Sequence, residues 1–203
     1  EVSGGITYNR TGGQRQRWES FCYSDPEQVA IIEKIAVLTA GYFDEIVLDD
    51  YYFTNCKCDL CIEGKGDKSW GEYRRDLLDH VAKHHIVEPA HKVNPKCKVI
   101  VKYPNWYDHF HGLGFDLERC PYTFDGVYTG TETRDPRGEQ HLQPYESYGI
   151  IRYFENLRPG HNFGGWVDTG SLRSLDMFSE QLDAFLRKGL VFLKKKMGLH
   201  VTI

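Results

Sequence analysis

A cysteine cluster beside two acids is the feature that most constrains this chain. Three cysteines with the spacing Cys-x-Cys-x-x-Cys occupy residues 56–61, and Asp49 and Asp50 come shortly before them. Residues 43–48, which precede the acids, have the composition of a buried β-strand. Because α/β folds hold their chemistry at the carboxyl ends of such strands, the segment combines candidate reactive groups with a candidate anchor.

Strand-like and helix-like segments alternate along the chain. The expected strands are 6–8, 43–48, 98–103, 124–129 and 161–167, and the expected helices are 26–40, 69–81, 144–157 and 175–188. Parallel neighbours need a crossover that is normally a helix, so this order favours a parallel sheet. Since no Gly-rich phosphate-binding turn follows the strands, a barrel is preferred over a nucleotide-binding open sheet.

The resulting interpretation is an α/β fold, a (β/α) TIM-type barrel that is complete or incomplete in this chain. A full barrel typically needs about 250 residues, whereas this chain has 203 and only five convincing strands. No repeat or low-complexity linker divides it. We therefore expect one barrel-type catalytic domain over residues 1–203, and truncation on its N-terminal side stays open because residue 1 is Glu.

Helix boundaries are marked by capping residues. Asp25 followed by Pro26 is a typical helix start, and Gly41 is a typical stop. Ser69 and Glu72 have the spacing of a capping box. These signals predict two helices, one before and one after residues 43–48 in the sequence.

Composition narrows the class of partner. With 25 basic and 29 acidic residues the formal charge is −4, which does not favour nucleic acid or an anionic membrane. No apolar run approaches the roughly 20 residues that a membrane span needs. We expect a soluble protein with a neutral or weakly charged substrate, either in the cytoplasm or, after loss of a leader, in the periplasm or outside the cell.

The cysteine spacing predicts a metal site. Cys56, Cys58 and Cys61 can surround one tetrahedral Zn²⁺ at metal–sulfur distances of about 2.3 Å. Cys22 is the best candidate for the fourth ligand, because it ends the preceding loop on the same face. Four thiolates form a closed, structural site that ties two loops together. The alternative is a set of reduced cysteines packed as small apolar side chains.

The motif order resembles the zinc-containing β-galactosidase family of glycoside hydrolases. The resemblance rests on residues 17–22 (Arg-Trp-Glu-Ser-Phe-Cys), on the cysteines of residues 56–61, and on residues 70–74 (Trp-Gly-Glu-Tyr-Arg). It implies a TIM-barrel catalytic domain in which a cysteine after the third strand joins a Cys-x-Cys-x-x-Cys group after the fourth. It also implies a carboxylic acid at the end of the fourth strand that acts as acid/base.

The chain departs from that family at the acids. Asp49-Asp50 stands where the family has Asn-Glu, and no Glu nucleophile is evident in residues 162–168. The resemblance therefore implies a distant relative, in which the four cysteines and, approximately, Asp50 are carried over, whereas the nucleophile is not.

Glycosidic cleavage generally needs two carboxyl groups across the sugar. Asp50 or Asp49 with Glu132, just after the strand at 124–129, is the preferred pair, and Asp168 is a weaker candidate. The placement of acids after the fourth and sixth strands also resembles α-galactosidase-like barrels, in which the fourth-strand acid is the nucleophile. The Asp at the fourth strand is therefore either the acid or the nucleophile, and Glu132 takes the other role. Each acid has a structural alternative, such as an ion pair of Glu132 with Arg134.

Aromatic and cationic residues near strand ends support a sugar site, because rings cover the apolar face of a pyranose. The candidate substrate contacts are Tyr52, Lys102, Tyr103, Trp106, Tyr128, Arg134 and Trp166. Core packing is the alternative for some of the rings, and an ordinary ion pair is the alternative for Lys102.

The sequence thus predicts a glycoside hydrolase with a structural zinc. Two other functions are compatible with it. One is a noncatalytic carbohydrate-binding barrel, and the other is a metal-dependent hydrolase with a catalytic zinc in an open site.

Overall fold

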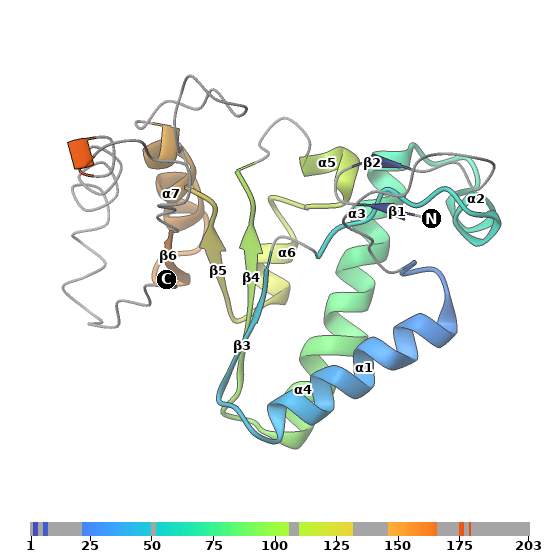
Figure 1. Ribbon diagram of the computed structural model, residues 1–203, viewed down its shortest axis with the longest axis horizontal. Coiled ribbons are helices and arrows are strands. Elements are labelled where there is room, and N and C mark those ends of the chain that lie inside the picture. Colours follow the sequence, from blue (N-terminus) through green and yellow to red (C-terminus); the bar gives the residue numbers. More distant parts are fainter. Residues whose placement is uncertain are drawn as a thin grey trace. The chain divides into compact units, whose positions relative to one another are not determined.

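The chain forms two compact units in a computed structural model. Figure 1 shows its helices and strands. The structure describes residues 2–3, 6–7, 22–49, 52–105, 110–131, 146–165, 175–176 and 179. Unit 1 comprises Glu1–Val101 and Trp106–Asp125, and unit 2 comprises Lys102–Asn105 and Gly126–Ile203. The single catalytic domain expected over residues 1–203 stays a prediction.

Helices and strands alternate in both units, which confirms the mixed α/β class. Unit 1 contains β1 (Val2–Ser3), β2 (Ile6–Thr7), α1 (Pro26–Ala40), β3 (Glu45–Leu48), α2 (Asp59–Lys65), α3 (Trp70–Val81), the π-helix η1 (Ala82–Val87), α4 (Glu88–Val93), most of β4 (Lys98–Tyr103), α5 (Phe110–Leu113) and α6 (Cys120–Thr123). Unit 2 contains the end of β4, β5 (Gly126–Thr129), α7 (Glu146–Leu157) and β6 (Asn162–Gly165). The helix expected at residues 175–188 lies largely outside the described residues.

The longer strands pair in parallel. In unit 1, β3 runs beside β4, with Glu45 opposite Lys98 and Leu48 opposite Val101. In unit 2, β5 runs beside β6, with an irregularity in register after Val127. The first two strands, β1 and β2, form an antiparallel pair. Parallel pairs joined through helices are the expected arrangement of an α/β fold, whereas closure into a barrel stays a prediction.

The helix-start signals act as the sequence predicts. Asp25 caps α1 by accepting a hydrogen bond from the Glu27 N–H at 2.9 Å, and Pro26 occupies the first turn. At the other end, the Gly41 N–H donates to the Val37 carbonyl. Ser69 and Glu72 form the reciprocal capping box at the start of α3. Each cap satisfies backbone groups that the first or last helical turn leaves without partners.

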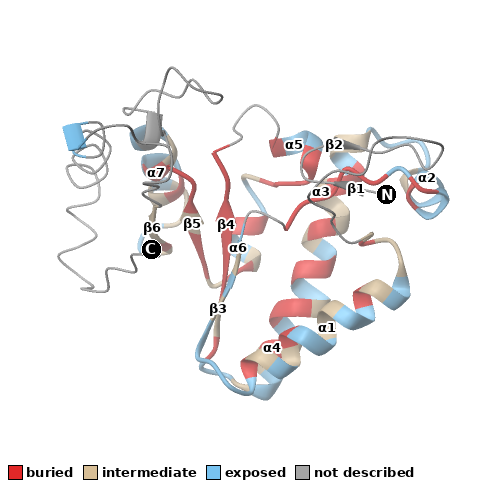
Figure 2. Ribbon diagram, viewed as in Figure 1, coloured by how far each residue is buried: buried red, intermediate tan, exposed pale blue. Residues whose placement is uncertain are grey.

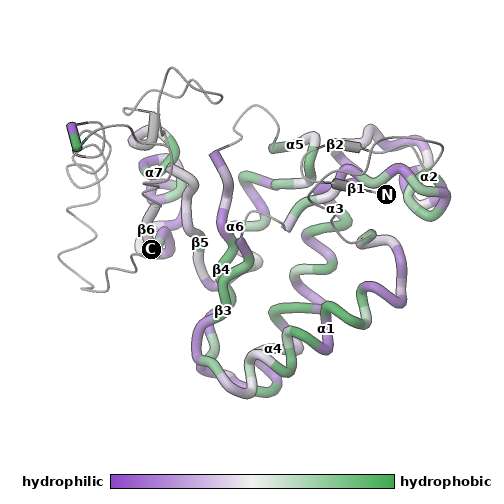
Figure 3. The backbone as a smooth tube through the Cα atoms, in the orientation of Figure 1, coloured by the Kyte–Doolittle hydropathy of each residue, from purple (hydrophilic) through white to green (hydrophobic). Residues whose placement is uncertain are grey.

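Strands β3 and β4 differ sharply in burial (Figure 2). Val99, Ile100 and Val101 of β4 are almost fully buried, and the strand is correspondingly hydrophobic (Figure 3). The expectation of a buried strand at residues 43–48 is wrong, because β3 alternates between exposed and half-buried residues and Val47 is 38% exposed. Among the described strands only β4 pairs with β3.

The core of unit 2 lies between α7 and the strand ends. Phe154 of α7 packs on the Tyr103 ring at a centroid distance of 4.5 Å. The Asn162 side-chain amide donates to the Ile151 carbonyl at 3.2 Å, which fixes the start of β6 against α7. A Cβ atom at Gly126 would approach the Phe163 ring to 2.3 Å, so glycine is required for this contact between β5 and β6.

None of the described helices is both long and apolar enough to cross a bilayer.

Candidate functional site

Four thiols of unit 1 converge on one point. The sulfur of Cys22 lies 3.5 Å from that of Cys58 and 3.7 Å from that of Cys61, and the Cys58 and Cys61 sulfurs are 3.7 Å apart. With Cys56, all four sulfurs lie within 4.8 Å of one another. The structure thus brings together all four cysteines that the sequence predicts as ligands.

These separations fit a tetrahedral metal site. A disulfide would place two sulfurs about 2.05 Å apart, whereas four sulfurs around a zinc ion at about 2.3 Å are separated by about 3.8 Å. All six cysteines of the chain are free thiols. Soft thiolates in this arrangement can hold Zn²⁺ in a closed site, in which no position is left for a substrate.

Local structure explains how the cysteines meet. Cys58 is the N-cap of α2 and Cys61 lies three residues later, so both side chains lie on one face of the first turn. The Cys56 N–H donates to the Thr54 hydroxyl at 3.2 Å, which shapes the loop before the helix. Cys22 comes from the chain just before α1. The four ligands therefore join two segments that are more than thirty residues apart in the sequence.

A hydroxyl relay supports the Cys61 sulfur. The Ser24 hydroxyl lies 3.2 Å from the Cys61 sulfur and 2.6 Å from the Tyr73 hydroxyl. Ser24 can donate its proton to the sulfur while it accepts one from Tyr73, an arrangement that orients metal ligands. The sequence predicts no site role for Ser24 or Tyr73, because their contact joins residues 49 positions apart.

The crowded thiols shift one another's acidity. Hydrogen bonds with Cys56 and Cys61, together with burial, raise the pKa of Cys22. Hydrogen bonds with Cys22 and then Cys61 lower the pKa of Cys56. For Cys61 the hydrogen bond with Cys22 lowers the pKa, but the bond with Cys56 and burial raise it further, to about 11. In the metal-free protein the cluster therefore favours a thiolate at Cys56 and protonated thiols at Cys22 and Cys61.

Three cationic side chains lie at the Trp70 ring, near the cysteine loop. The buried Arg74 guanidinium donates to the carbonyls of Asn55 at 2.9 Å and Gly112 at 2.6 Å, and it lies 4.9 Å from the centroid of the Trp70 ring. The ammonium groups of Lys57 and Lys65 also lie over this ring, at 5.7 and 5.6 Å. Arg74 interacts electrostatically with Cys61 and Cys56, so it can offset part of the net charge of −2 that Zn²⁺ with four thiolates carries.

Of the predicted acids, only Asp49 lies among the described residues. It directly follows β3, it is exposed, and its carbonyl accepts a hydrogen bond from the Tyr52 N–H at 3.2 Å. Asp50, Glu132 and Asp168 lie outside the described residues. The predicted pairing of carboxyl groups therefore stays a prediction.

The predicted substrate contacts differ in environment. Tyr52 is buried in unit 1, where its hydroxyl donates to the Leu78 carbonyl at 2.5 Å and its ring packs edge-on against Phe124. Tyr128 of unit 2 is half-buried beside Phe163. Trp106, Arg134 and Trp166 lie outside the described residues. A substrate contact by any of these residues stays a prediction.

Unit 2 has buried polar side chains at the carboxyl ends of its strands. Lys102, Asn105, Thr129 and Thr131 are each less than a tenth exposed. The Gly130 N–H donates to the Tyr103 carbonyl at 2.5 Å, so the ends of β4 and β5 lie side by side. Of these four residues only Lys102 was predicted as a site residue. The others carry no motif, and their position at the strand ends is the signal that could have found them.

The chain is similar in sequence to known proteins over most of its length. A family model described as "Probable glycosyl hydrolase, catalytic domain" matches residues 1–189. A protein of Saccharolobus solfataricus described as uncharacterized is 26% identical over 195 residues, which cover 83% of this chain and 32% of the relative. The chain thus spans about a third of the length of that relative. No solved structure matches the chain.

Proposed function

Because the chain belongs to the family of probable glycosyl hydrolase catalytic domains, we propose that it takes part in hydrolysis of a glycosidic bond in an oligo- or polysaccharide. The match over residues 1–189 is the observation that carries this proposal. The buried polar side chains at the strand ends of unit 2 support it, since α/β folds hold their chemistry at the carboxyl ends of their strands.

The proposed reaction uses two carboxyl groups. One protonates the leaving glycosidic oxygen, and the other attacks the anomeric carbon or activates a water molecule. We assign the acid role to Asp50, as the resemblance to zinc-containing β-galactosidases implies, and the partner role to Glu132. The reverse assignment, with Asp50 as nucleophile, corresponds to the α-galactosidase-like order. Asp49 and Asp168 are the alternative acids.

Binding of the sugar is assigned to the predicted rings and cations at the strand ends. Tyr128 is half-buried, so part of its ring can lie against the apolar face of a pyranose. Lys102 carries a buried ammonium at the end of β4, where it can donate to a hydroxyl or to the leaving oxygen. The proposed set of contacts is completed by Tyr52, Tyr103, Trp106, Arg134 and Trp166.

The four-cysteine centre is proposed as a structural zinc site. Its closed geometry favours hydrolysis by carboxyl groups over a reaction at the metal, because a catalytic zinc keeps one position open for water or substrate. The same arrangement of cysteines supports the proposed distant relationship to the zinc-containing β-galactosidases.

Substitution of the two proposed acids tests this function. With aryl glycosides and oligosaccharides as substrates, Asp50→Asn and Glu132→Gln should each lower kcat by about 10²- to 10⁴-fold, because the proton transfer or attack is lost. Sugar binding, measured by calorimetry, and the melting temperature should stay unchanged. Glu118→Gln, a change at an exposed acid, is the matched control.

Two results would contradict the proposal in different ways. Unchanged turnover in both variants would exclude this pair of acids. Sugar binding without turnover in the unmodified chain would instead indicate a noncatalytic carbohydrate-binding module.

A further inference from the structure

Three imidazoles gather in unit 1 where α3 passes into the π-helix η1. The ring of His80 lies 4.8 Å from that of His84 and 5.8 Å from that of His85, measured between centroids. In an α-helix residues four apart share a face, whereas the i→i+5 geometry of a π-helix also brings residues five apart together. The π-helix thus explains why both later histidines contact His80.

Two carboxylates orient the outer imidazoles. Nδ1 of His84 lies 2.9 Å from a carboxylate oxygen of Glu88, and Nδ1 of His85 lies 2.8 Å from one of Glu33. In the tautomer whose Nδ1–H donates to the carboxylate, the lone pair of the imidazole lies on Nε2. A carboxylate that holds one ring nitrogen while the other is free for an ion is the usual support of a metal-binding histidine.

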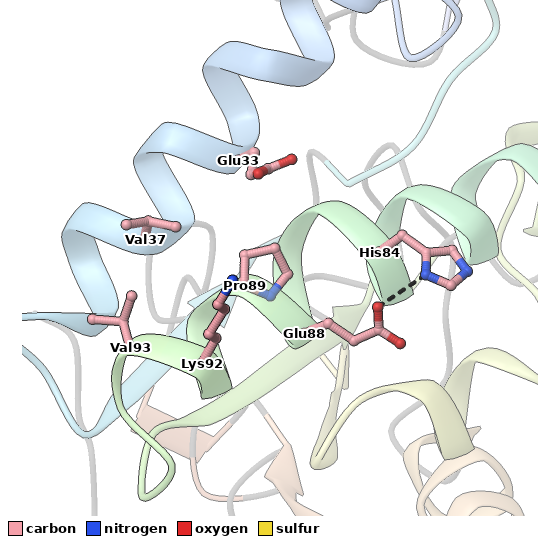
Figure 4. A pocket seen from close by; sticks show the side chains of 7 residues that line it. All are labelled: Glu33, Val37, His84, Glu88, Pro89, Lys92 and Val93. Atoms are coloured by element: carbon pink, nitrogen blue, oxygen red, sulfur yellow. Dashed lines mark hydrogen bonds and ion pairs between the residues drawn. The ribbon is translucent and has the colours of Figure 1, made fainter.

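The cluster is accessible from solvent. His80 is exposed, and the side chains of His84 and His85 are 42% and 31% exposed. His84 and Glu88 line one side of a groove of about 350 Å³, and Glu33 of α1 lines the other (Figure 4). An ion with several water ligands can therefore reach the histidines without any change in the core.

We propose that His80 and His84 chelate a divalent late transition-metal ion, such as Cu²⁺, Ni²⁺ or Zn²⁺, through Nε2 of His84 and a ring nitrogen of His80. Two imidazoles bound to one ion at about 2.0–2.1 Å, with an angle of about 90–110° at the metal, have ring centroids roughly 4.5 to 5.2 Å apart. The centroid separation of 4.8 Å between His80 and His84 falls in this range. Imidazole ligands favour these metals, whereas Mg²⁺ and Ca²⁺ prefer oxygen.

This site differs from the cysteine centre. Among the described residues, the four cysteines are the only group of three or more side chains placed to hold a metal ion. The histidine site therefore has two protein ligands, and water completes the coordination. His85, held by Glu33, stands beside the chelate as a neighbouring imidazole. The proposal does not depend on the hydrolase function.

Titration with Ni²⁺ tests the proposal on untagged protein whose cysteine centre is already loaded with zinc. Calorimetry should detect a Ni²⁺ site that is lost in His80→Gln and His84→Gln. Glu88→Gln should weaken it by about 10-fold, because the support of His84 is removed. His91→Gln is the matched control, since His91 also pairs with a carboxylate, that of Asp125, but stands outside the cluster.

Paramagnetic broadening by Ni²⁺ gives a second readout that needs no variant. The imidazole NMR signals of His80 and His84 should broaden at the lowest Ni²⁺ concentration, before that of His91. Equal Ni²⁺ affinity in the unmodified protein and in His84→Gln, or first broadening at His91, would overturn the proposal. Zinc content, measured in parallel, shows that the cysteine centre is unaffected.

Discussion

The cysteine centre and the end of strand β3 lie close in sequence, but they meet opposite physical requirements. Cys56, Cys58 and Cys61 are buried, and their surroundings supply hydrogen bonds and positive charge. Asp49, only seven positions before Cys56, is exposed. A closed ligand set contributes to stability, whereas a reacting carboxyl group must stay accessible to substrate. Substitutions in the first region should therefore change stability, and those in the second should change turnover.

Loss of one ligand should produce the largest change in stability. We expect Cys58→Ser to destabilise the zinc-loaded protein by on the order of 5 kcal/mol, a fall in melting temperature of roughly 10–20 °C, because structural zinc binding contributes directly to folding. Calorimetric melting and zinc content provide the measurement. Cys97→Ser is the matched control, as Cys97 is equally buried but stands outside the cluster. Equal losses of stability in the two variants would show that Cys58 contributes no more to stability than a buried cysteine outside the metal centre.

The affinity of the cysteine centre for zinc should depend steeply on pH. The pKa of Cys22 is raised by its hydrogen bonds with Cys56 and Cys61, and that of Cys61 is raised to about 11, so both thiols are protonated in the metal-free protein at neutral pH. Zinc must displace these protons. The affinity should therefore rise with pH and fall with acidification.

A competition titration between pH 6 and 8 checks this dependence. The logarithm of the zinc affinity should increase by about two or more for each pH unit, since at least the protons of Cys22 and Cys61 are released. An affinity that is independent of pH would show that the thiols are already ionised without the metal. The His84→Gln variant serves as a control that leaves the cysteine centre intact.

Features that depend on short sequence separations were predictable. The start of α1 at Asp25, its end at Gly41 and the start of α3 at Ser69 and Glu72 could be predicted, because each cap involves residues only a few positions apart. The cysteine ligands were predictable for a similar reason. Their spacing already restricts them to one turn, so only Cys22 required an argument about neighbouring loops.

Features that depend on distant contacts were not predictable from a single sequence. The exposure of β3 depends on which strands lie beside it, and the Tyr52 hydroxyl bonds to a carbonyl 26 residues away. The π-helix η1 has no sequence signal in a run that otherwise continues from α3 to α4. Consequently the contact of His85 with His80, five positions earlier, was not predictable, whereas His80 and His84 have the four-residue spacing of one helix face.

The smallest expected effect concerns the hydroxyl relay behind Cys61. Ser24→Ala removes the hydrogen bond to the sulfur and leaves the Tyr73 hydroxyl without this partner. We expect zinc affinity to fall by about 10-fold, as for other groups that orient metal ligands, with little change in the fold. Thr39→Ala is the matched control, because its hydroxyl bonds only within α1, to the Ile35 carbonyl. Equal zinc affinity in the two variants would show that burial alone holds Cys61 in place, which would narrow the stabilising region to the four thiols themselves.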